Sequence, residues 1–415
     1  MSLGRRSLAN LLGAVLPVAV QVPVVGLLAR WLDAESFSLV LLGWALLALA
    51  ALLDAGTTRA LVRQSSLPQA DPRLLPTALS FTACSGLLGA MLLWLAAPVA
   101  VAALAVDPRA SDDAVQGLRL AALALPLLLP TLVLQAHWDA REDFAESNLQ
   151  RVVAGCLLPL GTLLGAGWGG SVSSAMAGML ASRALALALA LQRRSLWRLA
   201  SPRAARLGCL RRLLAEGGWV TVSALASALM NTLDRYLLGW VRGAAGVAAY
   251  AAPSDAANKL LTLPVAVTRG LFPALARRPE GSEAEAWRRQ AWRWVALVSL
   301  PPALLAGLAA GPLLALWLGE RWAAPATPVL QCLMLGFVCG AFAQLPFTEV
   351  QARGRADASA RLHLLELGPF LLLAWALCQQ LGALGAAWAW TLRNAADLLL
   401  HLALAARLRR QEGGA

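Results

Sequence analysis

Apolar segments of about 20 residues recur along the whole chain, and they constrain its fold more than any other feature. A segment of that length crosses a bilayer as a helix, which satisfies its backbone hydrogen bonds internally. Twelve such segments lie near residues 8–29, 37–58, 76–97, 118–137, 149–168, 171–191, 219–241, 246–272, 294–315, 326–348, 362–380 and 383–406. The sequence therefore predicts an all-α polytopic membrane protein with about 12 transmembrane helices.

Composition agrees with this class. The 415 residues are 59% hydrophobic and 14% charged, with a mean hydropathy of +0.64, which is outside the range of soluble enzymes. The net charge of +12 invites a nucleic-acid interpretation, but the distribution of the basic residues argues against one. Of 35 Lys and Arg residues, 24 fall in alternate connections and in both termini, whereas only five fall in the other connections. The positive-inside rule then places both termini in the cytoplasm.

A weak internal repeat divides the chain. Thr57–Leu61 is echoed by Val267–Leu271 at an offset of 210 residues, and Trp31 is matched by Trp240 at 209. Two halves with six helices each have the same orientation, which is the layout of a parallel repeat with a pseudo-twofold axis along the membrane normal. We expect an N-terminal six-helix lobe over 1–191, a basic cytoplasmic linker over 192–215 and a C-terminal six-helix lobe over 216–415.

Ionisable side chains lie inside several of these segments. Asp234, Asp255 and Lys259 lie in the stretch from 219 to 278, and Arg393 and Asp397 lie one turn apart in the last segment. Each such group costs about 2.5–3.5 kcal/mol in hydrocarbon, so these side chains should face a bundle interior or a wet cavity. The protein is therefore expected to enclose a polar route through the membrane.

No motif indicates enzymatic chemistry. A P-loop requires a lysine after a glycine-rich turn, and the only lysine is Lys259 in an apolar helix. The three histidines have no spacing typical of a metal site or a catalytic triad, and the six cysteines are scattered. We expect no cofactor, no metal and no catalytic residue, so the chain is interpreted as a transporter and not an enzyme.

Several stretches carry a family resemblance. They are Ser7–Val40, Leu52–Arg63, Asn231–Gly239 (NTLDRYLLG), Gly246–Arg278 and Gly311–Gly336. In order and over nearly the whole chain, they resemble the bacterial polysaccharide-biosynthesis membrane proteins, the lipid-linked oligosaccharide flippases often called O-antigen translocases. These belong to the multidrug/oligosaccharidyl-lipid/polysaccharide flippase superfamily. The resemblance implies two six-helix lobes around a central cavity that opens alternately to the two sides.

The resemblance also implies a function. It is the flipping of an undecaprenyl-diphosphate-linked oligosaccharide to the outer leaflet of the bacterial inner membrane, for O-antigen (lipopolysaccharide), capsule or exopolysaccharide biosynthesis. A polysaccharide polymerase and glycosyltransferases would then be partners, together with membrane lipids, and nucleic acid would not. A cation-coupled multidrug or metabolite exporter of the same superfamily is the alternative. A membrane glycosyltransferase or polymerase is a weaker one, because the outer loops are short.

Two sets of candidate site residues follow. Guanidinium forks match phosphate oxygens, so the cations within or at the ends of the spans are candidates for holding a lipid diphosphate: Arg59, Arg183, Lys259, Arg269 and Arg393. Without a nucleotide site, transport needs an ion gradient, and the candidate ion carriers are Asp234, Asp255, Glu366 and Asp397. The alternative readings remain open: Arg59 and Arg269 as anchors at the inner interface, and the carboxylates as members of structural ion pairs.

The topology can be tested with reporter fusions. A fusion after Ala110 should report the outer side of the membrane, and a fusion after Ala205 should report the cytoplasm. Finding both fusions on the same side would contradict the predicted arrangement.

Overall fold

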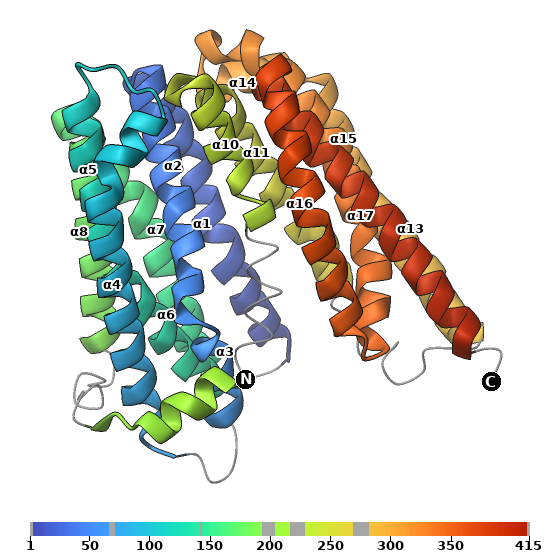
Figure 1. Cartoon of the computed structure of the whole chain (residues 1–415). Helices are drawn as coiled ribbons and strands as arrows, with labels where there is room; N and C mark the ends of the chain where they lie inside the picture. Colours follow the sequence, from blue (N-terminus) through green and yellow to red (C-terminus); the bar gives the residue numbers. More distant parts are fainter. Residues whose placement is uncertain are drawn as a thin grey trace. The chain divides into compact units, whose positions relative to one another are not determined.

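The computed structural model describes residues 3–65, 71–141, 143–192, 204–215, 229–268 and 282–412, and these residues form helices and connections without a strand. The chain divides into two compact units, Met1–Leu225 and Ala226–Ala415. Figure 1 shows the helices of each unit. The all-α polytopic class predicted from the apolar segments is confirmed.

Unit 1 contains eight labelled α-helices and one 3₁₀ turn among its described residues. They are α1 (Leu3–Trp31), α2 (Ala34–Ala50), η1 (Ala51–Asp54), α3 (Thr57–Ser65), α4 (Leu74–Ala103), α5 (Ser111–Leu123), α6 (Leu125–Ala140), α7 (Phe144–Gly169) and α8 (Val172–Gln192). A further short helix covers 207–215.

Unit 2 is built in the same way from long apolar helices. Its described elements are α10 (Leu233–Arg242), η4 (Ala244–Val247), α11 (Ala248–Leu260), α13 (Ser282–Leu308), α14 (Ala310–Leu318), α15 (Glu320–Ala352), α16 (Ala356–Leu381) and α17 (Ala383–Glu412). A helical turn at 262–268 follows α11.

Eight helices in the described residues are long and apolar enough to cross a membrane. They overlap eight of the twelve predicted segments, from 37–58 to 171–191 and from 294–315 to 362–380, although 294–315 is divided between α13, which already begins at Ser282, and α14. Of the others, the first corresponds to α1, whose part from Leu16 to Trp31 is an apolar helix shorter than a full span. The segments 219–241 and 246–272 lie partly outside the described residues. The last, α17, is helical throughout, but Arg393, Asn394 and Asp397 lower its hydropathy.

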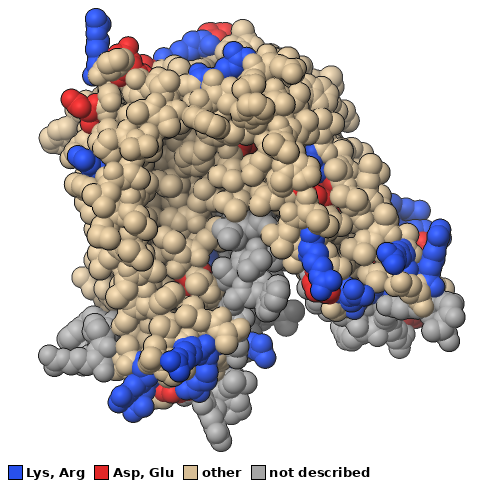
Figure 2. Space-filling view, viewed as in Figure 1, with Lys and Arg blue, Asp and Glu red and all other residues tan. Residues whose placement is uncertain are grey.

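The surface of each unit has the character expected in a bilayer. Figure 2 shows that Lys, Arg, Asp and Glu gather mainly towards the ends of the helices, whereas the flanks between them are largely free of charge. Large apolar side chains of these helices are exposed, among them Leu95, Leu164, Leu308 and Leu372, each at least 69% exposed. Lipid chains are the solvent that such a surface requires.

The region predicted as a linker includes a helix that packs on unit 1. In residues 207–215, Cys209 and Leu213 are buried in a cluster with residues of α3, α4 and α6. Arg212 and the Cys209 thiol both contact Asp71, at 3.4 and 3.3 Å. The backbone N–H of Arg73 and the Cys209 thiol lower the pKa of Asp71, while burial and the nearby Asp71 raise the pKa of Cys209. Cys209 therefore stays a thiol at neutral pH and donates to the carboxylate.

Glycine allows α7 and α8 to approach closely. A Cβ atom on Gly178 would lie 2.0 Å from the carbonyl oxygen of Gly161, and one on Gly165 would lie 2.1 Å from that of Ser174. Small residues at such positions are the usual basis of helix association in membranes, because lipid provides no hydrophobic force between helices. The α7–α8 contact therefore depends on these residues having no larger side chain.

In unit 2, α15 is the central helix and packs against α11, α13, α14 and α17. Its small residues again set the spacing, because a Cβ on Gly336 would meet Trp390 and Thr391, and one on Gly340 would meet Asn394. The Thr391 hydroxyl donates to the carbonyl oxygen of Cys332 at 2.9 Å. This contact fixes the rotation of α17, and hence the direction in which its polar residues point.

The glycine contact of unit 1 leads to a stability prediction. Gly178→Ala should lower the melting temperature of the purified protein, because overpacking a close contact costs about 1–3 kcal/mol. Gly368→Ala is the matched control, since a Cβ at Gly368 meets no atom within 4 Å. The control should be neutral or slightly stabilising. Equal melting temperatures for the two variants would contradict the close α7–α8 contact.

Candidate functional site

The first part of the site is a buried ion-pair network between α10 and α11. Arg235 on α10 contacts Asp255 on α11, with 2.5 Å between Nη2 and Oδ1. Asp234, which is fully buried, accepts hydrogen bonds from the Tyr250 hydroxyl and from the backbone N–H of Arg235. The carboxylates of Asp234 and Asp255, both predicted from the sequence as ion carriers, are thus held by Arg235 and Tyr250.

Arg393 of α17 extends this network. Its Nη1 donates to Oδ1 of Asn231 at 2.9 Å, and its charge lies within Coulombic range of Asp397, Glu366 and Asp234. Glu366 on α16 is 9% exposed, and neither of its carboxylate oxygens has a hydrogen-bond partner among the described residues. An ionised carboxylate in this position lacks the hydrogen bonds that normally accompany burial.

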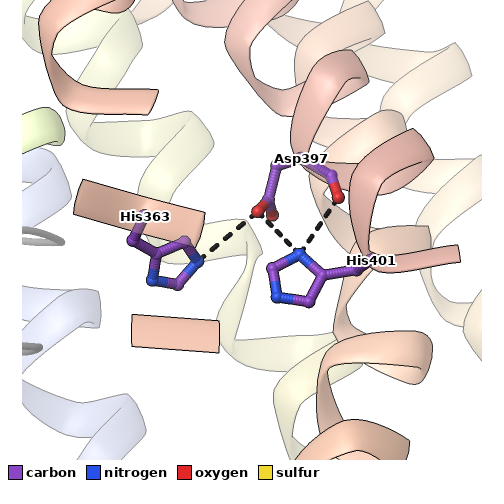
Figure 3. Close-up of side chains that lie close together, drawn as sticks. All are labelled: His363, Asp397 and His401. Atoms are coloured by element: carbon purple, nitrogen blue, oxygen red, sulfur yellow. Dashed lines mark hydrogen bonds and ion pairs between the residues drawn. The ribbon is translucent and has the colours of Figure 1, made fainter. Parts of the chain in front are cut away.

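Next to Arg393 and Glu366 in the chain lies a cluster of two histidines around one aspartate, shown in Figure 3. Oδ1 of Asp397 lies 2.9 Å from Nδ1 of His401, one turn further along α17, and 3.4 Å from Nε2 of His363 on α16. All three residues are buried. Phe347 of α15 stacks on His363 and meets His401 edge-on, at centroid distances of 5.7 and 5.4 Å.

The position of the histidines in this cluster was not expected from the sequence. Their spacing in sequence indicated no metal site, yet His363, Asp397 and His401 are a group in the described residues whose donor atoms lie within 4.8 Å of one another. The helices α16 and α17 meet at Gly382, which lies 19 residues after His363 and 19 residues before His401. That equal spacing about a turn was the signal in the sequence, because an antiparallel helix pair brings equidistant residues to the same depth.

A groove of about 870 Å³ runs along α16 and α17. Arg355, Asp357, Arg361 and Arg407 line it at the end where α16 begins, and Glu366 and Arg393 line it further along. Its remaining lining is apolar: Ala358, Leu362, Leu365, Pro369, Phe370, Leu373, Leu392, Ala396, Leu400 and Leu404. We call the end lined by Arg355, Asp357, Arg361 and Arg407 the rim of the groove. From the sequence, its three arginines had been interpreted only as cytoplasmic residues that set the membrane topology.

The other predicted cations lie in different places. Arg59 is exposed on α3 and Arg183 is half-buried on α8, so both belong to unit 1. The Nε atom of Arg183 is buried and has no hydrogen-bond partner among the described residues. Lys259 is half-buried on α11, one turn beyond Asp255. Arg269 lies outside the described residues. Within unit 2, the structure brings together Arg393, Glu366 and Asp397 from the predicted sets, and adds His363 and His401.

The chain has relatives in sequence. Residues 27–327 match a family model described as polysaccharide biosynthesis protein. A curated protein of Shigella flexneri named "Putative O-antigen transporter" is 28% identical over 405 residues, which cover 96% of this chain and 97% of the relative.

Solved structures show the same fold. An inward-facing multidrug resistance MATE family transporter of the MOP superfamily aligns with a TM-score of 0.79 at 16% identity, covering 95% of this chain and 98% of that one. The lipid II flippase MurJ in an inward closed conformation also gives 0.79, at 11% identity, covering 96% and 86%. At such identities the likeness concerns the fold alone, and it agrees with the predicted fold class.

The α10–α11 network leads to a stability prediction. Arg235→Met should lower the melting temperature strongly, because it leaves the carboxylates of Asp234 and Asp255 without their cation, and breaking a buried pair costs about 3–5 kcal/mol. Adding Asp255→Met to the first change should restore part of the loss, since the double variant has no unpaired Asp255. Thermal unfolding of the purified proteins checks both outcomes. A double variant no more stable than the single one would contradict the pairing.

Proposed function

The chain belongs to the polysaccharide biosynthesis protein family, and from that premise we propose that it translocates an undecaprenyl-diphosphate-linked oligosaccharide across the bacterial inner membrane. The direction is from the cytoplasmic to the outer leaflet, by alternating access. The product would serve O-antigen, capsule or exopolysaccharide biosynthesis. Its family membership confirms the resemblance found in the sequence, and its relative from Shigella flexneri supports the O-antigen assignment.

The observation that carries this proposal is the groove along α16 and α17. Its rim has three arginines and one aspartate, and Arg393 lies further along it. Its walls are mainly leucine, with two alanines, one proline and one phenylalanine. A lipid-linked diphosphate has the matching character, because its diphosphate requires cationic donors and its polyprenyl chain requires an apolar surface. A soluble sugar has no apolar chain that would contact these walls.

The predicted cations receive roles on this basis. Arg59 and Arg269 would capture the diphosphate at the cytoplasmic mouth, since each lies at that end of its predicted span. Lys259 and Arg393 would hold the diphosphate midway, and Arg183 is a further candidate on α8. The rim arginines Arg355, Arg361 and Arg407 join this set because they line the groove that leads to Arg393.

Energy for net movement would come from an ion gradient or the membrane potential, which supplies about 2.3 kcal/mol per charge per 100 mV. Four carboxylates were predicted as proton or sodium carriers. Asp234 and Asp255 are engaged by Tyr250 and Arg235, which favours a structural role for both. Glu366 and Asp397 are the better candidates because no arginine or lysine within the described residues forms an ion pair with either.

The alternative is a cation-coupled multidrug or metabolite exporter, and one of the structural neighbours is named as a multidrug resistance MATE family transporter. The groove separates the two functions, since an arginine-rich rim repels the organic cations that many exporters carry and attracts anionic lipids. A glycosyltransferase or polymerase would need a catalytic base beside a sugar site. The proposal includes both termini in the cytoplasm, and a polymerase and glycosyltransferases as partners.

The substrate assignment is tested on the rim of the groove. Arg361→Ala with Arg407→Ala should weaken binding of undecaprenyl diphosphate to the purified protein in nanodiscs by at least about tenfold, because each charge-assisted hydrogen bond contributes about 1.5–3 kcal/mol. Both side chains are exposed, so the fold should persist. The control is Arg289→Ala with Arg410→Ala, which removes two exposed arginines of the same unit that do not line the groove.

Flipping in proteoliposomes completes this test. The rim variant should flip a lipid-linked oligosaccharide more slowly than the control variant, and imposed proton, sodium or voltage gradients should change the rate. Equal binding by both variants would remove the groove from the substrate path. Export of an organic cation without any flipping would favour the alternative function. A flipping rate that does not change with any imposed gradient would indicate that the carboxylates are structural groups and not ion carriers.

A further inference from the structure

The cluster of His363, Asp397 and His401 has the donor set of a transition-metal site. Two imidazole nitrogens and one carboxylate oxygen suit zinc and other first-row divalent cations, whereas sodium, magnesium and calcium prefer oxygen alone. Zinc bonds of about 2.0–2.1 Å in tetrahedral geometry separate donor atoms by about 3.3 Å. The two nitrogens lie 2.9 and 3.4 Å from Oδ1 of Asp397, and all three donors lie within 4.8 Å of one another.

The charge around the cluster also favours a cation. With neutral histidines, Asp397 and Glu366 contribute two negative charges, and Arg393 contributes one positive charge within Coulombic range of both carboxylates. Glu366 is also within range of Asp397 and His401, and its oxygens have no hydrogen-bond partner among the described residues. A bound cation would compensate these carboxylates in an apolar region, and Glu366 offers a fourth ligand oxygen if its side chain turns towards the metal.

An ion has a route to this position. Glu366 and Arg393 line the groove, Asp397 lies one turn beyond Arg393 on α17, and His363 lies one turn before Glu366 on α16. The side chain of Asp397 is 12% exposed and that of His363 is 9% exposed. The cluster is therefore next to the groove and is not sealed from it.

Each histidine has a second ring nitrogen that does not face Asp397, and the surroundings of these two nitrogens indicate how tightly a metal would be held. Nδ1 of His363 and Nε2 of His401 are buried without a hydrogen-bond partner among the described residues. Structural metal sites normally have a carboxylate or carbonyl oxygen at this position, and its loss weakens binding by about 10- to 100-fold. The arrangement thus fits an exchangeable ion better than a permanent one.

We propose that His363, Asp397 and His401 bind a divalent transition-metal ion of the zinc class, reversibly, with Glu366 or water as the fourth ligand. The ion bridges α16 and α17. Because these helices also form the proposed substrate groove, occupancy would clamp them together and inhibit transport. Metal binding does not depend on the proposed function; only the expected inhibition rests on it.

The site is tested by adding Co²⁺ and then Zn²⁺ to metal-free purified protein. One equivalent of Co²⁺ should bind and give the visible absorption of a tetrahedral nitrogen–oxygen site, Zn²⁺ should displace it, and excess Na⁺ or Mg²⁺ should not. His363→Gln and His401→Gln should each weaken binding by at least about tenfold. His137→Gln is the matched control, because His137 is the only other histidine and lies on α6 in unit 1.

Each outcome decides the proposal. Absence of Co²⁺ binding to the unaltered protein would overturn it, and this result does not depend on whether a variant folds. Equal binding by His363→Gln and His137→Gln would overturn it as well. In proteoliposomes, Zn²⁺ should slow flipping by the unaltered protein and not by His363→Gln. If the metal binds as expected but no lipid-linked glycan is flipped, the proposed function fails while the metal site stands.

Discussion

The compensation of charge inside a lipid-exposed bundle is the constraint on which unit 2 depends. Arg235 is 5% exposed and would be untenable there without Asp255 and the neighbouring Asp234. The network ties α10 to α11, and the bond from Arg393 to Asn231 brings in α17. Because Arg235 and Arg393 each find a partner outside their own helix, these two charges specify which segments are neighbours and in which rotation.

Close packing between α15 and α17 determines where the charged side chains of α17 point. Gly336 and Gly340 on α15 let Trp390, Thr391 and Asn394 of α17 approach its backbone. The opposite side of α17, which carries Arg393 and Ala396, then faces the groove shared with α16. Asp397 lies between these two sides and reaches His363. A substitution that widened the α15–α17 contact would rotate α17, and it would move the ion-pair residues and the groove lining together.

The same pair of helices serves both proposals of function. A lipid-linked anion requires cations and an apolar wall in one continuous surface, and the groove has both. The histidine cluster lies beside it, so a cation bound there and an anionic headgroup near Arg393 would attract each other. Binding of the two would then be linked through Coulomb energy over a short distance, although a bound metal ion would still slow transport by holding α16 to α17.

The sequence by itself determined the class of the protein, the position of most spans and the identity of several buried charges. Apolar length is a local property, so segments such as 326–348 and 362–380 needed no tertiary information. The helical spacing of Arg393, Asp397 and His401 likewise placed them on one face of one helix.

Tertiary structure decided which of these charges have partners. The sequence grouped Asp234, Asp255, Glu366 and Asp397 together, whereas packing gave the first two to Tyr250 and Arg235 and left Glu366 without a hydrogen bond among the described residues. Tertiary structure also placed Arg361 and Arg407 at the rim of a groove, whereas in the sequence these arginines had indicated only the membrane topology. The physical reason is that pairing depends on the depth and rotation of neighbouring helices. Those are set by contacts between residues distant in sequence, of which the equal spacing of His363 and His401 about Gly382 was the one visible trace.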